Sequence, residues 1–204
     1  MSASSVEPVA GNVYDKYTSH SAAVRRLMRG FLASLDELMA RAAPESLLDV
    51  GCGEGVVTRR MAVRIGSGAR VVGLDRDDPA LRRAWARRDG VAFVTGDAHA
   101  LPFGEGEFDA VTLVESLQLM DDPPRALAEA GRVARRSMLV SVPREPLWRA
   151  LNVARGAYLR RLGDTPGHLH HWSRQGLIDL LAAHGEIVAV RSPLPWTLAL
   201  LRTG

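Results

Sequence analysis

A glycine-rich segment flanked by acids is the part of the chain whose residue types and spacing most clearly suggest chemistry. Residues 47–55 read LLDVGCGEG, so an apolar run ends at Asp49 and then breaks into glycines spaced G-x-G-x-G. A buried strand that turns into a helix through such a loop brings its backbone close to a ligand. A side chain at Gly51 or Gly53 would fill that space. The acids Asp49 and Glu54 disfavour a polyanion and favour a ligand that carries an ammonium group and ribose hydroxyls.

The glycine spacing also separates this loop from a dinucleotide-binding loop. A dinucleotide fingerprint needs its third glycine one residue later, at the position of Val56. A nicotinamide-dependent oxidoreductase is therefore disfavoured. Cys52, the single cysteine, is interpreted as a small residue that fits a tight turn and not as a nucleophile. With only one cysteine, an internal disulfide and any multi-cysteine metal or iron–sulfur site are excluded.

Three more acids follow apolar runs downstream of the glycine loop. Asp75 ends VVGLD, about twenty residues on, where an acid at a strand end can accept hydrogen bonds from ribose hydroxyls. Asp97 follows a third run; its carboxylate could accept from an exocyclic amine while the Ala98 N–H donates to a ring nitrogen, which favours adenine. Glu115 follows a fourth run and is delivered to the rim where open α/β sheets bind ligands.

The elements that must position these residues alternate between strand-like and helix-like patterns. Such alternation predicts a parallel sheet with crossover helices on both faces. Apolar residues at helical spacing predict a first helix over 20–42. Strands are predicted at 46–50, 70–74, 91–95, 108–114 and 136–142, and helices at 55–65, 78–89 and 122–134.

The alternation stops after residue 142. Residues 143–172 are punctuated by proline and glycine around an amphipathic piece, Leu147 to Leu162. Ser173 is predicted to cap a helix through His184, and strands at 186–191 and 195–202 to form an antiparallel hairpin at the sheet edge. The expected organisation is one domain over 1–204, with a flexible start (1–12), an N-terminal cap helix (13–42), a cofactor-binding core (45–142), a substrate-cap insertion (143–172) and a final helix and hairpin (173–204).

Composition narrows the function classes. The chain has 204 residues, 47% hydrophobic and 24% charged, typical of a soluble globular protein. No apolar run reaches the roughly 20 residues of a membrane span, and the first ten residues do not resemble a secretory signal, so a cytoplasmic location is expected. Lys16 is the only lysine and the net charge is +3. Because arginines recur along the whole chain, we interpret them as exposed helix faces, and nucleic-acid binding is disfavoured.

Taken together, the motifs LLDVGCGEG, VVGLD, GDAHALPFGEGEFDAV and DDPPRALAEAGRV resemble, in order and interval, the class I S-adenosylmethionine-dependent methyltransferases. They are most similar to the small-molecule type 11 group that includes ubiquinone and sterol methyltransferases. The resemblance covers residues 45–142 strongly and 173–202 more weakly. It implies a Rossmann-like α/β fold: a seven-stranded, mostly parallel sheet with helices on both faces and an antiparallel C-terminal hairpin.

The resemblance also implies roles for individual residues. Asp49, Gly51 and Gly53 would surround the methionine end of S-adenosylmethionine, with Leu117 or Gln118 on the same wall. S-adenosylhomocysteine would be the product. The remaining implied cofactor contacts are Asp75 with its neighbour Arg76 at the ribose, Asp97 and Ala98 at the adenine, Glu115 near the transferable methyl group, and an N-terminal aromatic, Tyr17 or Tyr14, over the cofactor.

A sulfonium methyl group is already activated, so in-line displacement mainly requires positioning and removal of the nucleophile's proton. Glu115 or one of His168, His170 and His171 is the candidate base. Loop packing is the alternative for these histidines, and no metal is expected because no carboxylate follows them at a ligand spacing.

The predicted function is methyl transfer to an oxygen or nitrogen of a small-molecule metabolite. Aromatics and arginines in 143–172, among them Trp148 and Tyr158, suit an apolar or anionic acceptor. They also suit RNA. An RNA methyltransferase and a non-catalytic cofactor-binding subunit therefore stay open as alternatives. The apolar hairpin Leu194–Leu201 is a candidate surface for a homodimer.

Overall fold

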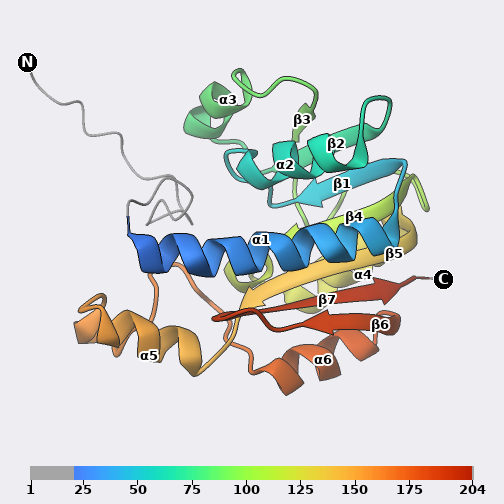
Figure 1. Ribbon diagram of the computed structural model, residues 1–204. Helices are drawn as coiled ribbons and strands as arrows, with labels where there is room; N and C mark the ends of the chain where they lie inside the picture. The colour runs from blue at the N-terminus through green and yellow to red at the C-terminus, as the bar shows by residue number, and fades with distance from the viewer. Residues whose placement is uncertain (1–20, 204) are drawn as a thin grey trace, which may run out of the picture.

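The computed structural model describes residues 21–203 and contains the expected seven-stranded sheet (Figure 1). The first five strands pair in parallel, and β7 runs antiparallel to both β5 and β6. The order across the sheet is β3-β2-β1-β4-β5-β7-β6. The predicted fold class is therefore confirmed. The strands are β1 (Ser46–Val50), β2 (Arg70–Asp75), β3 (Ala92–Thr95), β4 (Phe108–Val114), β5 (Ala134–Pro143), β6 (Glu186–Arg191) and β7 (Trp196–Arg202).

Two helical layers cover the sheet, which is why its central strands are apolar on both faces. Every residue of β4 is buried. Helices α1 (Ala22–Ala42) and α2 (Val56–Ile65) share one core cluster with the sheet, whereas α4 (Pro123–Val133) and α6 (Arg174–Ala182) belong to the other. The expected flexible start (1–12) and the first part of the expected cap helix (13–42), with Tyr14 and Tyr17, lie outside the described residues.

Side-chain caps fix where several of these helices begin. The carboxylate of Asp78 accepts from Ala80 N ahead of α3 (Pro79–Trp85), and Asp122 does the same for Arg125 N ahead of α4. Both helices start at a proline, whose missing N–H costs nothing in the first turn. Ser173 caps α6 as predicted, because its hydroxyl accepts from Gly176 N.

One predicted helix is shorter than expected, and the amphipathic piece after residue 146 is helical only in its first half. The helix expected over 78–89 ends at Trp85, and Arg88 N already bonds Trp85 O in a tighter turn. The amphipathic piece expected over 147–162 is only α5 (Leu147–Ala154), followed by a short 3₁₀ turn. Gly156 interrupts it with φ +73°, a conformation that a helix cannot continue through.

The C-terminal hairpin is present, but it does not offer the expected dimer surface. Because β7 lies between β5 and β6, its residues Leu198, Leu200 and Leu201 are buried within the two cores. Leu194, in the turn, is 53% exposed. The expectation of a broad apolar contact surface over Leu194–Leu201 is therefore wrong. None of the helices within residues 21–203 is long and apolar enough to cross a membrane.

Candidate functional site

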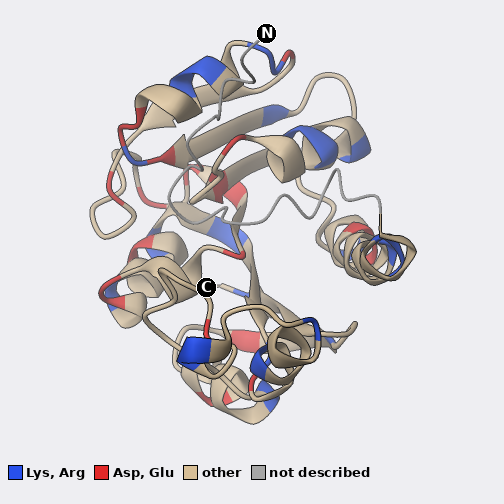
Figure 2. Ribbon diagram, turned by 90° about the vertical axis from the view of Figure 1, so that its left-hand side faces the viewer, with Lys and Arg blue, Asp and Glu red and all other residues tan. Residues whose placement is uncertain are grey.

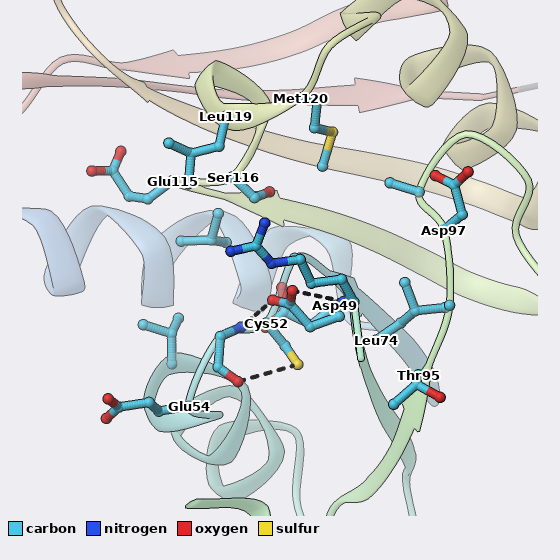
Figure 3. A pocket seen from close by; sticks show the side chains of 18 of the residues that line it. Asp49, Cys52, Glu54, Leu74, Thr95, Asp97, Glu115, Ser116, Leu119 and Met120 are labelled. Atoms are coloured by element: carbon cyan, nitrogen blue, oxygen red, sulfur yellow. Dashed lines mark hydrogen bonds between the residues drawn. The ribbon is translucent and has the colours of Figure 1, made fainter. Parts of the chain in front are cut away.

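A cavity of about 760 Å³ opens at the C-terminal ends of β1, β2 and β4 (Figure 3). Strand order reverses between β1 and β4, and the crevice at such a switch point is where open α/β sheets bind ligands. The cavity is lined by Asp49, Gly51, Cys52, Gly53, Glu54, Val56, Val57, Leu74, Asp75, Arg76, Asp77, Thr95, Gly96, Asp97, Ala98, His99, Val114, Glu115, Ser116, Leu119, Met120, Asp121 and Gly167.

The glycine loop is tied to the end of β2, and the first two of its three glycines serve different purposes. Gly51 N and Cys52 N both donate to Leu74 O, at 2.8 and 3.1 Å. A Cβ at Gly51 (φ +74°) would lie 2.4 Å from the Cβ of Ser116, so this glycine is required by the protein's own packing. A Cβ at Gly53 (φ +54°) would meet nothing within 4 Å. Gly53 therefore leaves space for a ligand.

Asp49 is buried at the end of β1 and held by two hydroxyl groups. Its Oδ2 accepts from Thr58 Oγ1 at 2.6 Å, and its Oδ1 accepts from Thr112 Oγ1 at 2.7 Å. Burial raises the pKa of this carboxyl from 3.8 to about 6, against the effect of those hydrogen bonds. A cationic group bound beside it would favour the ionised form. Sequence reasoning missed both threonines, since neither follows a glycine or ends a strand.

Asp75 links the glycine loop to β2. Its Oδ2 accepts from Gly53 N at 2.7 Å and its Oδ1 from Arg76 N at 2.8 Å, while Trp85 Nε1 donates to Gly53 O at 2.7 Å. Burial raises the pKa of Asp75. Each carboxylate oxygen keeps a further lone pair for a hydroxyl of a ligand. Arg76, the other predicted residue here, lines the same part of the cavity.

Asp97 lies across the cavity from the glycine loop (Figure 3), and its neighbour Ala98 also lines the cavity. The N–H and ring Nδ1 of His99 both contact Asp97 Oδ1 at 2.8 Å, and these bonds lower the pKa of Asp97. Among the described residues only Oδ1 is engaged, so Oδ2 can accept from a ligand amine. His99 was not predicted; it follows Asp97 by two residues and fixes its rotamer.

Glu115 follows β4 with a strained backbone, φ +58°, which is rare for a residue that is not glycine. Its N–H donates to Ser141, and its Oε2 accepts from Trp196 Nε1 at 2.7 Å. Trp196 was not singled out from the sequence, because the contact spans 81 residues. The prediction that Leu117 or Gln118 lines this wall is wrong. Both are buried beneath it, and the residues that line the cavity are Leu119 and Met120.

The three predicted histidines are near the cavity but not in its wall. Among the described residues of the loop that carries these histidines, Gly167 is the one that lines the cavity. His168 stacks near Trp148, His170 stacks on Trp172, and His171 Nε2 lies 2.7 Å from Asp164 Oδ1. The sequence pattern did not predict Asp164 as a partner, because this carboxylate precedes the histidines instead of following them.

Cys52 is held inside the loop with its Sγ 3.7 Å from Gly53 O. Burial and the nearby carboxylates raise the pKa of its thiol, so it stays protonated. This agrees with its interpretation as a packing residue, since the thiolate is the nucleophilic form.

The donor set fits an adenosyl sulfonium ligand. Three acids, Asp49, Asp75 and Asp97, line one cavity from three successive strand ends, and Gly53 opens the backbone to it. Carboxylates suit an ammonium group, ribose hydroxyls and an adenine amine. They repel the pyrophosphate of a dinucleotide, which the helix α2 N-terminus would otherwise attract.

Known proteins agree with this interpretation. The family described as "Methyltransferase domain" matches residues 48–140. A demethylmenaquinone methyltransferase of Beutenbergia cavernae is 35% identical over 130 residues, which are 63% of this chain and 52% of that protein. A nocamycin O-methyltransferase of Saccharothrix syringae is 40% identical over 94 residues, 44% of this chain and 34% of its own length. The chain thus spans about half, or less, of these relatives.

A solved structure extends the likeness over the whole fold. Magnesium protoporphyrin IX methyltransferase of Synechocystis, crystallised with bound S-adenosylhomocysteine, superposes with a TM-score of 0.63 at 17% identity. The superposition covers 91% of this chain and 89% of that one. Residues 48–140 thus match the methyltransferase domain family, and the fold, with its cavity at the switch point of the sheet, is that of a solved methyltransferase.

Proposed function

We propose that this protein transfers the methyl group of S-adenosylmethionine to an oxygen or nitrogen of a small-molecule metabolite. The observation that carries the proposal is the arrangement of Asp49, Asp75 and Asp97 around one cavity that Gly53 leaves open. When bound, S-adenosylmethionine supplies an activated methyl group on its sulfonium. Asp49 would hold the ammonium group, Asp75 the ribose hydroxyls, and Asp97 with Ala98 the adenine.

Of the candidate bases, Glu115 lines the cavity, whereas the three histidines do not. The indole N–H of Trp196 fixes one oxygen of its carboxylate. A carboxylate held in this way can accept the proton of an acceptor hydroxyl or amine as the new bond forms. We therefore assign the base role to Glu115. On this assignment His168 and His171 are not the base. They belong to the cap, residues 143–172, and contribute to the acceptor side of the site.

A small-molecule acceptor is favoured over RNA by the distribution of charge. Basic and acidic residues alternate over several helices in Figure 2 and do not gather on one element. Many arginines already pair with carboxylates, and RNA phosphates would have to compete with these pairs. The pairs include Arg60 and Arg64 with Asp36, Arg70 with Glu107, Arg132 with Glu129, Arg135 with Asp109 and Arg191 with Glu37.

The relatives' names support small acceptors, since one acts on demethylmenaquinone and one is an O-methyltransferase named for nocamycin. The test is transfer of labelled methyl from S-adenosylmethionine to a panel of phenols, quinols, carboxylic acids and amines, with bulk tRNA in parallel. We expect label in a small molecule and none in tRNA. Label in tRNA alone would contradict the proposal. Binding of the cofactor without transfer to any acceptor would favour a non-catalytic subunit.

A further inference from the structure

The loop that carries the three histidines, residues 163–172, is firmly anchored beside the cavity. Leu169 N and His170 N both donate to Gln118 O, at 2.9 and 3.3 Å, which fixes the loop to the turn after β4. On its other side, Trp148 Nε1 donates to Thr165 Oγ1 at 2.9 Å. Side chains on such a loop are presented in a defined geometry, as a ligand site requires.

Three side chains of this loop converge. Asp164, His168 and His171 each offer one ligand atom, and these atoms all lie within 4.8 Å of one another. Ligand atoms of a tetrahedral zinc site lie about 3.4 Å apart, given metal–ligand bonds of about 2.0–2.2 Å. Small rotations of the side chains would therefore bring all three to one ion. His170, between them in sequence, points elsewhere and stacks on Trp172.

A second carboxylate lies behind this cluster. Glu145 is joined to the loop by its backbone N–H, which donates to Trp172 O at 2.9 Å. Its Oε1 is buried and has no hydrogen-bond partner among the described residues. Burial raises its pKa, and the charges of His171 and Asp164 both act on it. A buried carboxylate oxygen without a partner is costly, and a cation nearby would offset that cost.

A simple ion pair explains only part of this arrangement. The contact between His171 Nε2 and Asp164 Oδ1, at 2.7 Å, accounts for two of the three converging groups. The ligand atom of His168 also lies within 4.8 Å of both, and Oε1 of Glu145 has no hydrogen-bond partner among the described residues.

We infer that Asp164, His168 and His171 form a binding site for a divalent late first-row metal ion, with Zn²⁺ as the best match. Two imidazoles and one carboxylate suit zinc, cobalt or nickel, whereas Mg²⁺ and Ca²⁺ prefer oxygen ligands alone. Three protein ligands leave a coordination position open to water or to an oxygen of the acceptor. Since Gly167 lines the cavity, the ion would hold the acceptor side of the site in place.

The test is zinc binding to the full chain, freed of metal by a chelator, measured by competition with a chromophoric chelator. We expect one equivalent to bind, and the variants Asp164→Asn, His168→Ala and His171→Gln to weaken binding more than about tenfold, since even loss of an outer partner costs this much. His170→Ala, in the same loop, is the matched control and should bind zinc like the wild type. No saturable binding, or equal affinity in all four variants, would overturn the inference.

X-ray absorption on the zinc-loaded wild type keeps the test valid should the variants misfold. The inferred site requires two imidazoles with oxygen donors and no sulfur; a zinc–sulfur distance would point to Cys52 and refute it. Neither measurement uses cofactor or acceptor. A protein that transfers methyl groups but binds no zinc would therefore refute this inference alone.

Discussion

The cofactor half of the molecule (residues 46–121) and the cap (residues 143–172) hold their functional groups in different ways. In the cofactor half, acids follow strands, so the sheet places them, and backbone and side-chain donors then hold their carboxylates, as when Gly53 N donates to Asp75 and Thr58 donates to Asp49. In the cap, side chains hold one another, as when Trp148 donates to Thr165 and His171 contacts Asp164. The first arrangement is dictated by the sheet and the second by particular side chains. Changes in the two regions should therefore separate cofactor binding from handling of the acceptor.

The largest effect is expected at the boundary between the two regions. Glu115→Gln keeps the shape of the side chain but removes the proton acceptor, so kcat should fall by about 10²–10⁴-fold, the usual worth of a general base. The affinity for S-adenosylmethionine, measured by calorimetry, should change little. If kcat is unaffected while cofactor affinity falls, Glu115 belongs to cofactor binding and the base must be sought elsewhere.

Within the cofactor half, Gly51 is expected to matter for folding. Gly51→Ala places a Cβ 2.4 Å from Ser116 and forces alanine to φ +74°, so the free energy of unfolding should fall by about 2–4 kcal/mol. Chemical denaturation measures this. Gly53→Ala, which meets no atom, should lose only about 1 kcal/mol. Equal losses in the two variants would show that the loop packs differently.

A pH effect of intermediate size should come from Asp49. Its pKa is raised to about 6 in the free protein, so the carboxyl becomes neutral as the pH falls through 6. The attraction for an ammonium group is then lost, and cofactor affinity should drop about tenfold between pH 7 and pH 5. The raised pKa also means that Asp49 destabilises the free protein above pH 6, because the folded state binds this proton more tightly than the unfolded chain.

Asp49→Asn is the control for that pH dependence. Its cofactor affinity should be weak and nearly flat over the same range. A wild-type affinity that does not change between pH 5 and pH 7 would place the ammonium group away from Asp49.

The smallest effect is expected in the cap. Trp148→Phe keeps an aromatic ring against Trp196 but loses the hydrogen bond to Thr165, worth about 1 kcal/mol. The KM for the acceptor should rise severalfold while cofactor affinity stays constant. Thr165→Val removes the other partner, and the double variant should be no worse than either single one. A lower cofactor affinity with an unchanged KM for the acceptor would contradict the distinction between the two regions.

The same difference explains what the sequence could and could not predict. Asp49, Asp75, Asp97 and Glu115 were found because each follows an apolar run, and parallel strands deliver their ends to one edge. The contact between Glu115 and Trp196 could not be predicted from the sequence, because it joins residues that only the completed sheet brings together.

The cap was harder to predict for a related reason. The sequence indicated an amphipathic piece over 147–162 without helix bounds, and the structure shows that the helix within it ends at Ala154, ahead of Gly156 with its positive φ. The contact of Asp164 with His171 depends on how the loop folds back on itself, which spacing alone does not encode.

The central claim is that the glycine loop opens onto the site of S-adenosylmethionine, and two glycines test it directly. Gly53 and Gly156 both have positive φ, and a Cβ at either would meet no atom within 4 Å, but one lies in the cofactor half and the other in the cap. Calorimetric titration of S-adenosylmethionine into Gly53→Ala and Gly156→Ala measures cofactor affinity in both variants. Each variant strains the backbone in a similar way, so a difference in affinity reports on the place of the substitution. We predict that Gly156→Ala binds like the wild type and Gly53→Ala at least about tenfold more weakly. Unchanged affinity in Gly53→Ala would contradict the account.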